Sequence, residues 1–282
     1  MNIKKVAIIG VGLIGGSFGL ALKEIGFGAS IIGIGRNEEN LIRAKERGII
    51  DGYTTIAPHG VEDADLILLA TPVGRFEGIV NDIKDRIKKG AIVTDVGSVK
   101  TEVVRRLSPL MPDGVSFVGA HPIAGKESSG IGCASADIFK GTKCIITPAH
   151  ESDNESIEIV SSIWKRIGSE VIMMTPEDHD LIYSAISHLP HIVAYSLVNT
   201  IGDIDSEFIE FAGQGFKDTT RIALSSPELW RDIVLFNREN LIRMLEVFMK
   251  NIDRIKGLLE KEDSKAIKEE FERAREFRER LK

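Results

Sequence analysis

The sequence predicts an α/β protein in two parts, a parallel sheet covered by helices followed by a part made of helices alone. Short apolar runs alternate with amphipathic stretches up to residue 174, a pattern typical of parallel strands joined by crossover helices. A glycine-rich segment at 10–15 directly follows the first apolar run. Beyond residue 175 the strand signals stop. We therefore expect one domain over residues 1–174 and a second, helical domain over residues 175–282.

The elements of the first part follow from its periodicity. Apolar runs bounded by glycine, proline or charged residues predict strands, and stretches with apolar residues three and four positions apart predict helices. The expected strands are 4–10, 30–35, 65–72, 91–98, 115–122, 143–148 and 170–174. The expected helices are 13–26, 37–48, 76–90, 101–111 and 154–168.

The second part begins at residues 175–178, Thr-Pro-Glu-Asp, which are typical of a helix start. Residues 181–201 then form a run that is too long and too apolar for a helix on the surface of a monomer. Such a helix is buried either in a core or against a second subunit, and we expect a homodimer. Segments 226–261 and 263–282 are also helical by period, and the strong charge of the last one indicates a solvated face.

Composition excludes several classes of function. The chain has 282 residues, a formal net charge of -6 and a pI near 5.6, so it lacks the cationic excess of a nucleic-acid-binding or membrane-surface protein. Its two cysteines, Cys133 and Cys144, fit neither a disulfide framework nor a metal site. Residues 6–22 are uncharged like a signal-peptide core, but five glycines interrupt them. We expect a cytoplasmic protein with a small-molecule substrate and no bound metal.

The glycine-rich segment "GVGLIG" has the spacing of a dinucleotide-binding turn between a strand and a helix. Gly10 allows the tight turn, Gly12 lets a pyrophosphate approach the backbone, and Gly15 lets helix and strand pack closely. The phosphates then meet free N–H groups at the start of the helix. The first part is therefore expected to be a Rossmann-type domain, with cofactor-binding residues Gly10, Gly12, Leu13, Ile14 and Gly15.

The end of the second predicted strand bears on the choice between NAD and NADP. An NAD site usually has Asp or Glu here to bind the ribose hydroxyl, whereas this chain has Gly35 followed by Arg36. The missing acid removes repulsion of a 2'-phosphate, and the guanidinium can pair with one. NADP is favoured slightly, and a solvent-facing Arg36 in a site that accepts NAD remains the alternative.

Two further strand ends carry short polar residues, where ligands collect in open α/β sheets. "ATPV" at 70–73 contributes Thr71 and Pro72, and "DVGSVK" at 95–100 contributes Asp95. All three are expected on the cofactor side.

The segment "GAHPIAGKESSG" at 119–130 ends an apolar run on a His-Pro pair, and His121 is either a structural cap or a catalytic group. Together with "GVGLIGGSFGLALK", "ATPV", "DVGSVK", "SHLPHIVAYSL" and "AGQGFKDTTRIALSSPELW", this segment resembles the prephenate dehydrogenase family, which includes arogenate and cyclohexadienyl dehydrogenases. The motifs occur in the family's order from residue 4 to about residue 240. The chain resembles the stand-alone form, without a fused mutase or regulatory domain.

The resemblance implies an oxidative decarboxylation that uses NAD or NADP. His121 matches the histidine that accepts the proton of the substrate hydroxyl. Ser98 matches the serine that holds this histidine and the hydroxyl in register. Substrate-binding positions are Arg221, which grips a carboxylate, and His188, with Glu127, Lys126, Asp218 and Trp230 around the pocket. The family also makes tyrosine a possible product inhibitor.

Structural roles remain open for several of these residues. Ser98 could cap a strand, Arg221 could pair with Asp218, and His188 or Trp230 could belong to a core. His191 is read as structural.

Alternatives to prephenate dehydrogenase also remain. The nearest is an arogenate or dual-substrate enzyme, and a β-hydroxyacid dehydrogenase is more distant. A non-catalytic NAD(P)-binding redox sensor is a third possibility.

Overall fold

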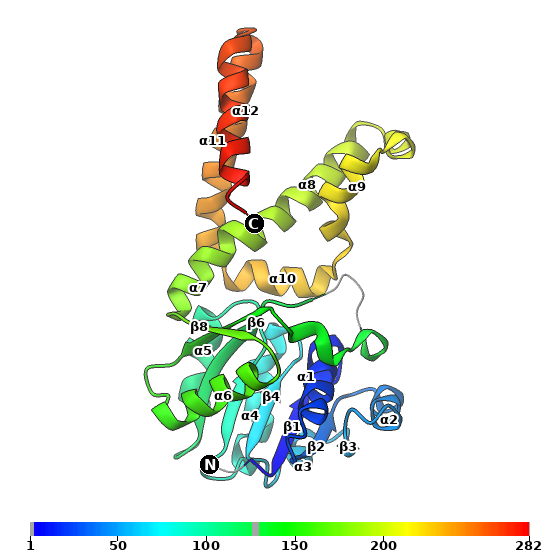
Figure 1. Cartoon of the computed structure of the whole chain (residues 1–282), viewed down its shortest axis with the longest axis vertical. Helices are drawn as coiled ribbons and strands as arrows, with labels where there is room; N and C mark the ends of the chain where they lie inside the picture. The colour runs from blue at the N-terminus through cyan, green and yellow to red at the C-terminus, as the bar shows by residue number, and fades with distance from the viewer. Residues whose placement is uncertain (1–2, 126–129, 282) are drawn as a thin grey trace. The chain divides into compact units, whose positions relative to one another are not determined.

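A computed structural model of the chain describes residues 3–125 and 130–281, and its first part is built on an eight-stranded sheet (Figure 1). The strand order is β3-β2-β1-β4-β5-β6-β7-β8, and the first six positions have the order of a doubly wound dinucleotide-binding sheet. The predicted Rossmann-type sheet is therefore confirmed. The strands are β1 (Lys5–Ile9), β2 (Ser30–Ile34), β3 (Gly52–Thr54), β4 (Leu66–Leu69), β5 (Ile92–Asp95), β6 (Ser116–Pro122), β7 (Lys143–Pro148) and β8 (Glu170–Met173).

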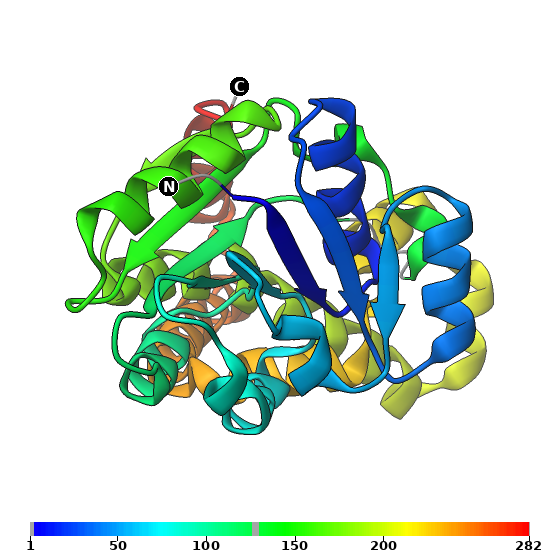
Figure 2. The same ribbon diagram turned by 90° about the horizontal axis from the view of Figure 1, so that it is seen from below.

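Both faces of the sheet are covered, which explains why its strands read as continuous apolar runs. Along β1, Val6 and Ile8 enter one hydrophobic core while Ala7 and Ile9 enter the other, because successive side chains point to opposite faces. Figure 2 shows helices on the two sides of the sheet. The first core contains residues of α1 (Leu13–Glu24), α2 (Glu38–Glu46) and α6 (Asn154–Arg166); the second contains residues of α3 (Ala57–Val61), α4 (Phe76–Ile83) and α5 (Thr101–Leu107).

The first part departs from the prediction at several places, among them the unpredicted helix α3 and the end of α5 at Leu107, before the expected residue 111. The short strand β3 was not predicted, because three half-buried residues give no periodic signal. The expected helix 76–90 ends as α4 at Ile83 and continues only as a 3-10 turn, Lys84–Arg86. Strand β7 pairs with β6 in the antiparallel sense, so the sheet is not entirely parallel. Antiparallel neighbours need no crossover helix. In the described residues of the connection, 123–125 and 130–142, the helical structure consists of two short 3-10 turns, Ile131–Cys133 and Ala136–Phe139.

Helices follow β8 and lie beyond the carboxyl ends of the strands (Figure 1). The first runs without interruption through α7 (Pro176–Tyr183), a π turn (Ser184–His188) and α8 (Leu189–Ile204). Pro190 has no N–H to donate, and the wider turn comes directly before it. The rest of this part consists of the 3-10 helix Ser206–Phe211, α9 (Gln214–Thr220), the 3-10 turn Arg221–Leu224 and α10 (Pro227–Phe236).

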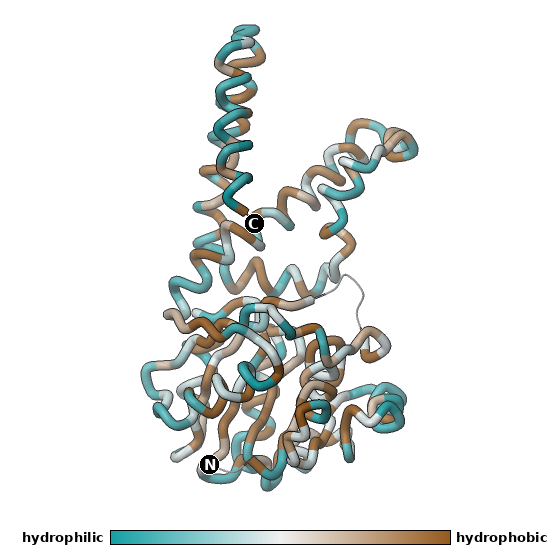
Figure 3. Tube along the Cα trace, in the orientation of Figure 1, coloured by the Kyte–Doolittle hydropathy of each residue, from teal (hydrophilic) through white to brown (hydrophobic). Residues whose placement is uncertain are grey.

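The long helix expected to be buried is only partly buried in the single chain. Only Ala194 of α8 is buried, and Ile186 and Ile204 keep 66% and 65% of their surface exposed. Figure 3 shows apolar stretches within this helix. By length and composition alone, Pro176–Ile204 is also apolar enough to cross a membrane. That test does not separate a membrane span from a helix covered by another protein subunit.

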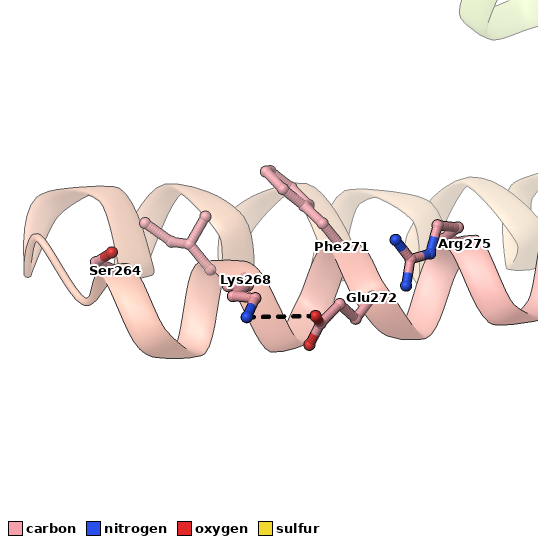
Figure 4. A pocket seen from close by; sticks show the side chains of 6 residues that line it. Ser264, Lys268, Phe271, Glu272 and Arg275 are labelled. Atoms are coloured by element: carbon pink, nitrogen blue, oxygen red, sulfur yellow. Dashed lines mark ion pairs between the residues drawn. The ribbon is translucent and has the colours of Figure 1, made fainter.

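Residues 238–282 form a compact unit separate from residues 1–237. This unit consists of α11 (Arg238–Glu260) and α12 (Ser264–Arg278), joined by an Arg254–Glu270 ion pair of 2.6 Å. Figure 4 shows a shallow hollow along α12, where Lys268 and Glu272 pair at 3.6 Å beside the exposed ring of Phe271. The domain boundary between residues 174 and 175 stays a prediction. The two compact units of the structure instead meet between residues 237 and 238.

Candidate active site

The glycine-rich turn lies where the strand order reverses between β1 and β4, the place where open α/β sheets bind dinucleotides. Gly10 has a φ of +101°, and a Cβ there would come within 2.6 Å of the Ala70 carbonyl oxygen. A Cβ on Gly15 would lie 2.1 Å from the Gly10 carbonyl oxygen. Both positions therefore require glycine to bring β1, α1 and the end of β4 together.

The residues of this turn fit a dinucleotide. A Cβ on Gly12 would meet no protein atom within 4 Å, so the backbone there is open to a bound group. Among the described residues no side chain caps the start of α1, so its first N–H groups can bind phosphate oxygens. Leu13 and Ile14 form that first turn. The turn is tied to α2 by Asn40, whose side-chain amide donates to the carbonyl oxygen of Val11 at 2.9 Å.

A buried ion pair joins the ends of β5 and β6. The side chains of Asp95 and Lys100 are both fully buried and form a close pair. Lys100 Nζ also donates to the Ala120 carbonyl at 2.9 Å, and the Ala120 N–H donates to Asp95 Oδ1 at 3.1 Å. Because Ala120 precedes His121, these bonds fix the backbone from which the His121 ring projects.

His121 is the first member of a chain of three side chains. Its Nδ1 lies 2.8 Å from Nε2 of His179, and Nδ1 of His179 lies 2.8 Å from Oδ1 of Asp180. Asp180 also accepts hydrogen bonds from the backbone N–H groups of Lys100 at 2.8 Å and Thr101 at 2.9 Å. The start of α5 and the end of β6 are thus linked through α7.

The surroundings of His121 favour the neutral ring. Burial, and then the nearby His179, Lys100 and His188, hold its pKa well below the usual value of 6.5. Burial also lowers the pKa of His179, although its bond to Asp180 acts in the opposite direction. A neutral His121 that carries its hydrogen on Nδ1 has Nε2 available as a proton acceptor.

His188 ends the π turn and is buried, with 1% of its surface exposed. Its Nδ1 lies 3.2 Å from the amide nitrogen of Asn237, which also donates to the Asp180 carbonyl at 2.7 Å. Its Nε2 has no partner with hydrogen-bond geometry among the described residues. Burial lowers the pKa of His188 to about 4, against a smaller opposing effect of the Asp180 charge and the Ser98 backbone.

Trp230 of α10 packs against His188 and His191. It is 9% exposed, stacks on His191 at 3.5 Å between ring centroids, and meets His188 edge-on at 5.9 Å. His191 Nδ1 also lies 2.9 Å from the Ser187 carbonyl oxygen. The structure thus brings Ser98, His188 and Trp230 together.

Other residues proposed from the sequence lie at more exposed positions or outside the described residues. Arg36 is exposed after β2, and Thr71 and Pro72 lie at the end of β4. Arg221 and Asp218 are exposed on α9 and the turn after it, where Asp218 accepts a 2.7 Å bond from the Gln214 amide. Asp95 has no exposed surface, and both its oxygens accept hydrogen bonds from protein groups. Lys126 and Glu127 lie outside the described residues.

Sequence reasoning missed His179, Asp180, Lys100 and Asn237. A signal was present in "TPEDHD", where a His-Asp pair follows directly after the last strand. Another was present in "DVGSVK", where a lysine stands in an otherwise small and apolar turn. Asn237 offered no local signal.

A dinucleotide-binding sheet with a neutral histidine at its carboxyl edge defines an NAD-dependent dehydrogenase. The family model described as "Prephenate dehydrogenase, nucleotide-binding domain" matches residues 18–173, and "Prephenate dehydrogenase, dimerization domain" matches residues 175–273. The chain therefore belongs to the prephenate dehydrogenase family, as the sequence motifs indicated.

Individual relatives agree with this membership. The chain is 35% identical over 280 residues to prephenate dehydrogenase of Bacillus subtilis, covering 98% of this chain and 76% of the relative. It is 30% identical to cyclohexadienyl dehydrogenase of Zymomonas mobilis, covering 99% and 96%. It resembles the crystal structure of prephenate dehydrogenase from A. aeolicus in complex with hydroxyphenyl propionate and NAD+, with a TM-score of 0.94, 35% identity and coverage of 100% and 99%.

The depressed pKa of His188 makes stability depend on pH. The folded chain binds a proton here only near pH 4, whereas the unfolded chain does so near pH 6.5, so stability is lost as pH falls between these values. The shift corresponds to about 3 kcal/mol in the free energy of unfolding. Urea unfolding of wild type and His188→Asn at pH 7 and pH 4 measures this difference. The exposed His59, changed to Asn, is the matched control, and equal acid sensitivity of wild type and His188→Asn contradicts the prediction.

Proposed function

We propose that the chain catalyses the NAD(P)-dependent oxidative decarboxylation of prephenate to 4-hydroxyphenylpyruvate, with His121 as the proton acceptor. The observation that carries this proposal is the neutral His121 at the carboxyl edge of the sheet that also carries the glycine-rich turn. Family membership supports the same reaction.

The reaction needs three things from the protein. The ring hydroxyl loses its proton as its carbon becomes a carbonyl, and Nε2 of His121 accepts that proton. When bound at the glycine-rich turn, NAD(P) accepts the hydride from the same carbon. The carboxylate at the opposite ring position leaves as CO2, and the electron pair of its broken bond makes the ring aromatic. The carbonyl oxygen thereby becomes the phenol oxygen and takes the proton back from His121.

The remaining predicted residues bind and orient the substrate in this proposal. Arg221 holds a carboxylate, because a guanidinium makes two parallel bonds to it. His188 faces the substrate with Nε2, the atom without a described partner. Ser98 keeps the hydroxyl in register with His121. Asp218, Trp230, Lys126 and Glu127 surround the pocket.

The cofactor proposal is that NADP binds somewhat better than NAD, with Gly10, Gly12, Leu13, Ile14 and Gly15 at the pyrophosphate. Thr71 and Pro72 belong to the same side of the site in this proposal, and the fully buried Asp95 supports that side through Lys100 without contacting the cofactor. The exposed Arg36 directly after β2 supports it.

The assembly proposal is a homodimer formed through the helical part. Exposed apolar residues occur along the continuous helix of α7, the π turn and α8, and further ones follow it at Phe208, Phe211 and Leu224. Together they exceed what isolated surface positions explain; those on the helix are Leu181, Ile182, Ile186 and Ile204. The family's dimerization domain covers the same segment. We also propose a cytoplasmic location, and tyrosine as a possible inhibitor that resembles the aromatic product.

The test of the reaction is steady-state kinetics with prephenate and with arogenate. Wild type is expected to turn over prephenate, and His121→Asn is expected to lose kcat by about 10²- to 10⁴-fold, the usual contribution of a general base. If kcat/KM is higher with arogenate than with prephenate, arogenate is the substrate instead.

Unchanged turnover in His121→Asn contradicts the assignment and favours a β-hydroxyacid dehydrogenase. Cofactor binding without turnover of either substrate favours a redox sensor.

The test of the cofactor preference is Arg36→Ala. Because the guanidinium pairs with a 2'-phosphate that NAD lacks, kcat/KM for NADP is expected to fall at least tenfold while that for NAD changes less than twofold. The neighbouring exposed Arg43→Ala is a control for loss of surface charge. Equal losses with both cofactors refute the role of Arg36.

The test of assembly is the solution mass. Light scattering at working concentration is expected to give twice the chain mass of 31.0 kDa. Ile186→Glu places a charge in the apolar face and is expected to shift the mass toward the monomer. A monomeric wild type removes the dimer proposal.

A further inference from the structure

We propose that His179 and Asp180 are positioning residues that set the tautomer of His121 and thereby make its Nε2 the proton acceptor. This inference rests on the proposed role of His121. It adds two residues to the site, neither of which touches substrate in the proposed reaction.

The direction of each hydrogen bond follows from the Asp180 end. Both Asp180 oxygens accept backbone N–H bonds from the start of α5, and a carboxylate can only accept. The His179 nitrogen that faces Asp180, Nδ1, must therefore carry the hydrogen.

The same logic continues to His121. A neutral His179 with hydrogen on Nδ1 has a lone pair on Nε2, which accepts from the nitrogen 2.8 Å away. Nδ1 of His121 must then carry its hydrogen, and Nε2 has the lone pair. In the opposite tautomer Nε2 would carry a hydrogen and could not accept a proton from a hydroxyl group.

Burial makes this chain of bonds effective. His179 and Asp180 are 0% and 1% exposed, so water does not compete for their bonds. When Nε2 of His121 takes up the substrate proton, the ring becomes a cation with hydrogen on both nitrogens. The Asp180 charge stabilises that cation through His179, and the proton returns from Nε2 to the oxygen of the product as the ring becomes aromatic.

Several other groups face His121 and must be considered in any pH measurement. Tyr183 of α7 packs edge-on at 5.2 Å between ring centroids, and Lys100 supplies a positive charge already paired with Asp95. The thiol of Cys144 in β7 lies near the backbone of His121, and His188 is the remaining imidazole. Asp180 is the one described carboxylate that reaches the ring through a hydrogen-bonded imidazole.

The first experiment compares Asp180→Asn with wild type. An asparagine can turn its NH2 toward His179 and reverse the hydrogens along the chain. We expect kcat to fall by about 10²-fold or more, with the KM values for prephenate and cofactor changed less than about threefold. The loss of a negative charge is also expected to move the acid limb of log kcat/KM to lower pH.

Asp178→Asn is the matched control, since it makes the same chemical change two residues earlier, on an exposed residue of α7. A loss in Asp180→Asn that lies in KM alone, or that equals the loss in Asp178→Asn, overturns the proposal. Thermal melting of both variants shows whether they are folded.

A second pair of variants keeps the test decisive if Asp180→Asn does not fold. Gln at position 179 can still accept from His121 Nδ1 through its amide oxygen, whereas Leu cannot. His179→Gln is expected to retain at least tenfold more kcat than His179→Leu. Equal activity of the two variants contradicts the proposal.

The tautomer can also be read without activity. Long-range ¹H–¹⁵N NMR of the histidine rings is expected to show His121 of the wild type protonated on Nδ1, and Asp180→Asn shifted toward Nε2. If wild type turns over neither prephenate nor arogenate, the proposed function fails while this measurement still decides the tautomer. Protonation of wild-type His121 on Nε2 overturns the inference.

Discussion

The buried pair of Lys100 and Asp95 is the interaction on which the geometry of the site depends. Neither side chain reaches solvent, and each is bound to the backbone of Ala120 as well as to the other. Removing one partner of such a pair leaves a charge in a region of low dielectric constant, at a cost of about 3–5 kcal/mol. The backbone N–H of Lys100 also holds Asp180. One residue thus aligns β5, β6 and α7.

The fold could be predicted from the sequence to the extent that it repeats a local pattern. The apolar runs of β1 and β4 and the glycine spacing at Gly10 and Gly15 each have a physical cause within a few residues. The antiparallel pairing of β7 could not be predicted in this way, because it depends on the path of the connection. Strand β3 is too short to show a period.

The residues of the candidate site could likewise be predicted only where a local pattern marks them. His121 could be found because it ends a strand inside a specific motif. Its partner His179 lies 58 residues further along the chain, and no periodicity reports a contact over that separation. Asp95 resembled a ligand-binding residue because it ends a strand. Its burial depends on Lys100, which folds back on it from the following turn.

The π turn at Ser184–His188 has a consequence for the phase of the helix that contains it. Each residue of an α-helix advances by about 100° around the axis, so an extra residue in one turn rotates everything after it relative to everything before. The segment before the turn directs His179 and Asp180 toward the sheet, and His188 still reaches Asn237. Beyond it, the side chains of α8 are half-buried or exposed, with Ala194 the one that is fully buried. Deleting one residue between Ser184 and His188 would restore ordinary winding and put these two sets of contacts out of step. The length of this turn is therefore as much a part of the site as its side chains.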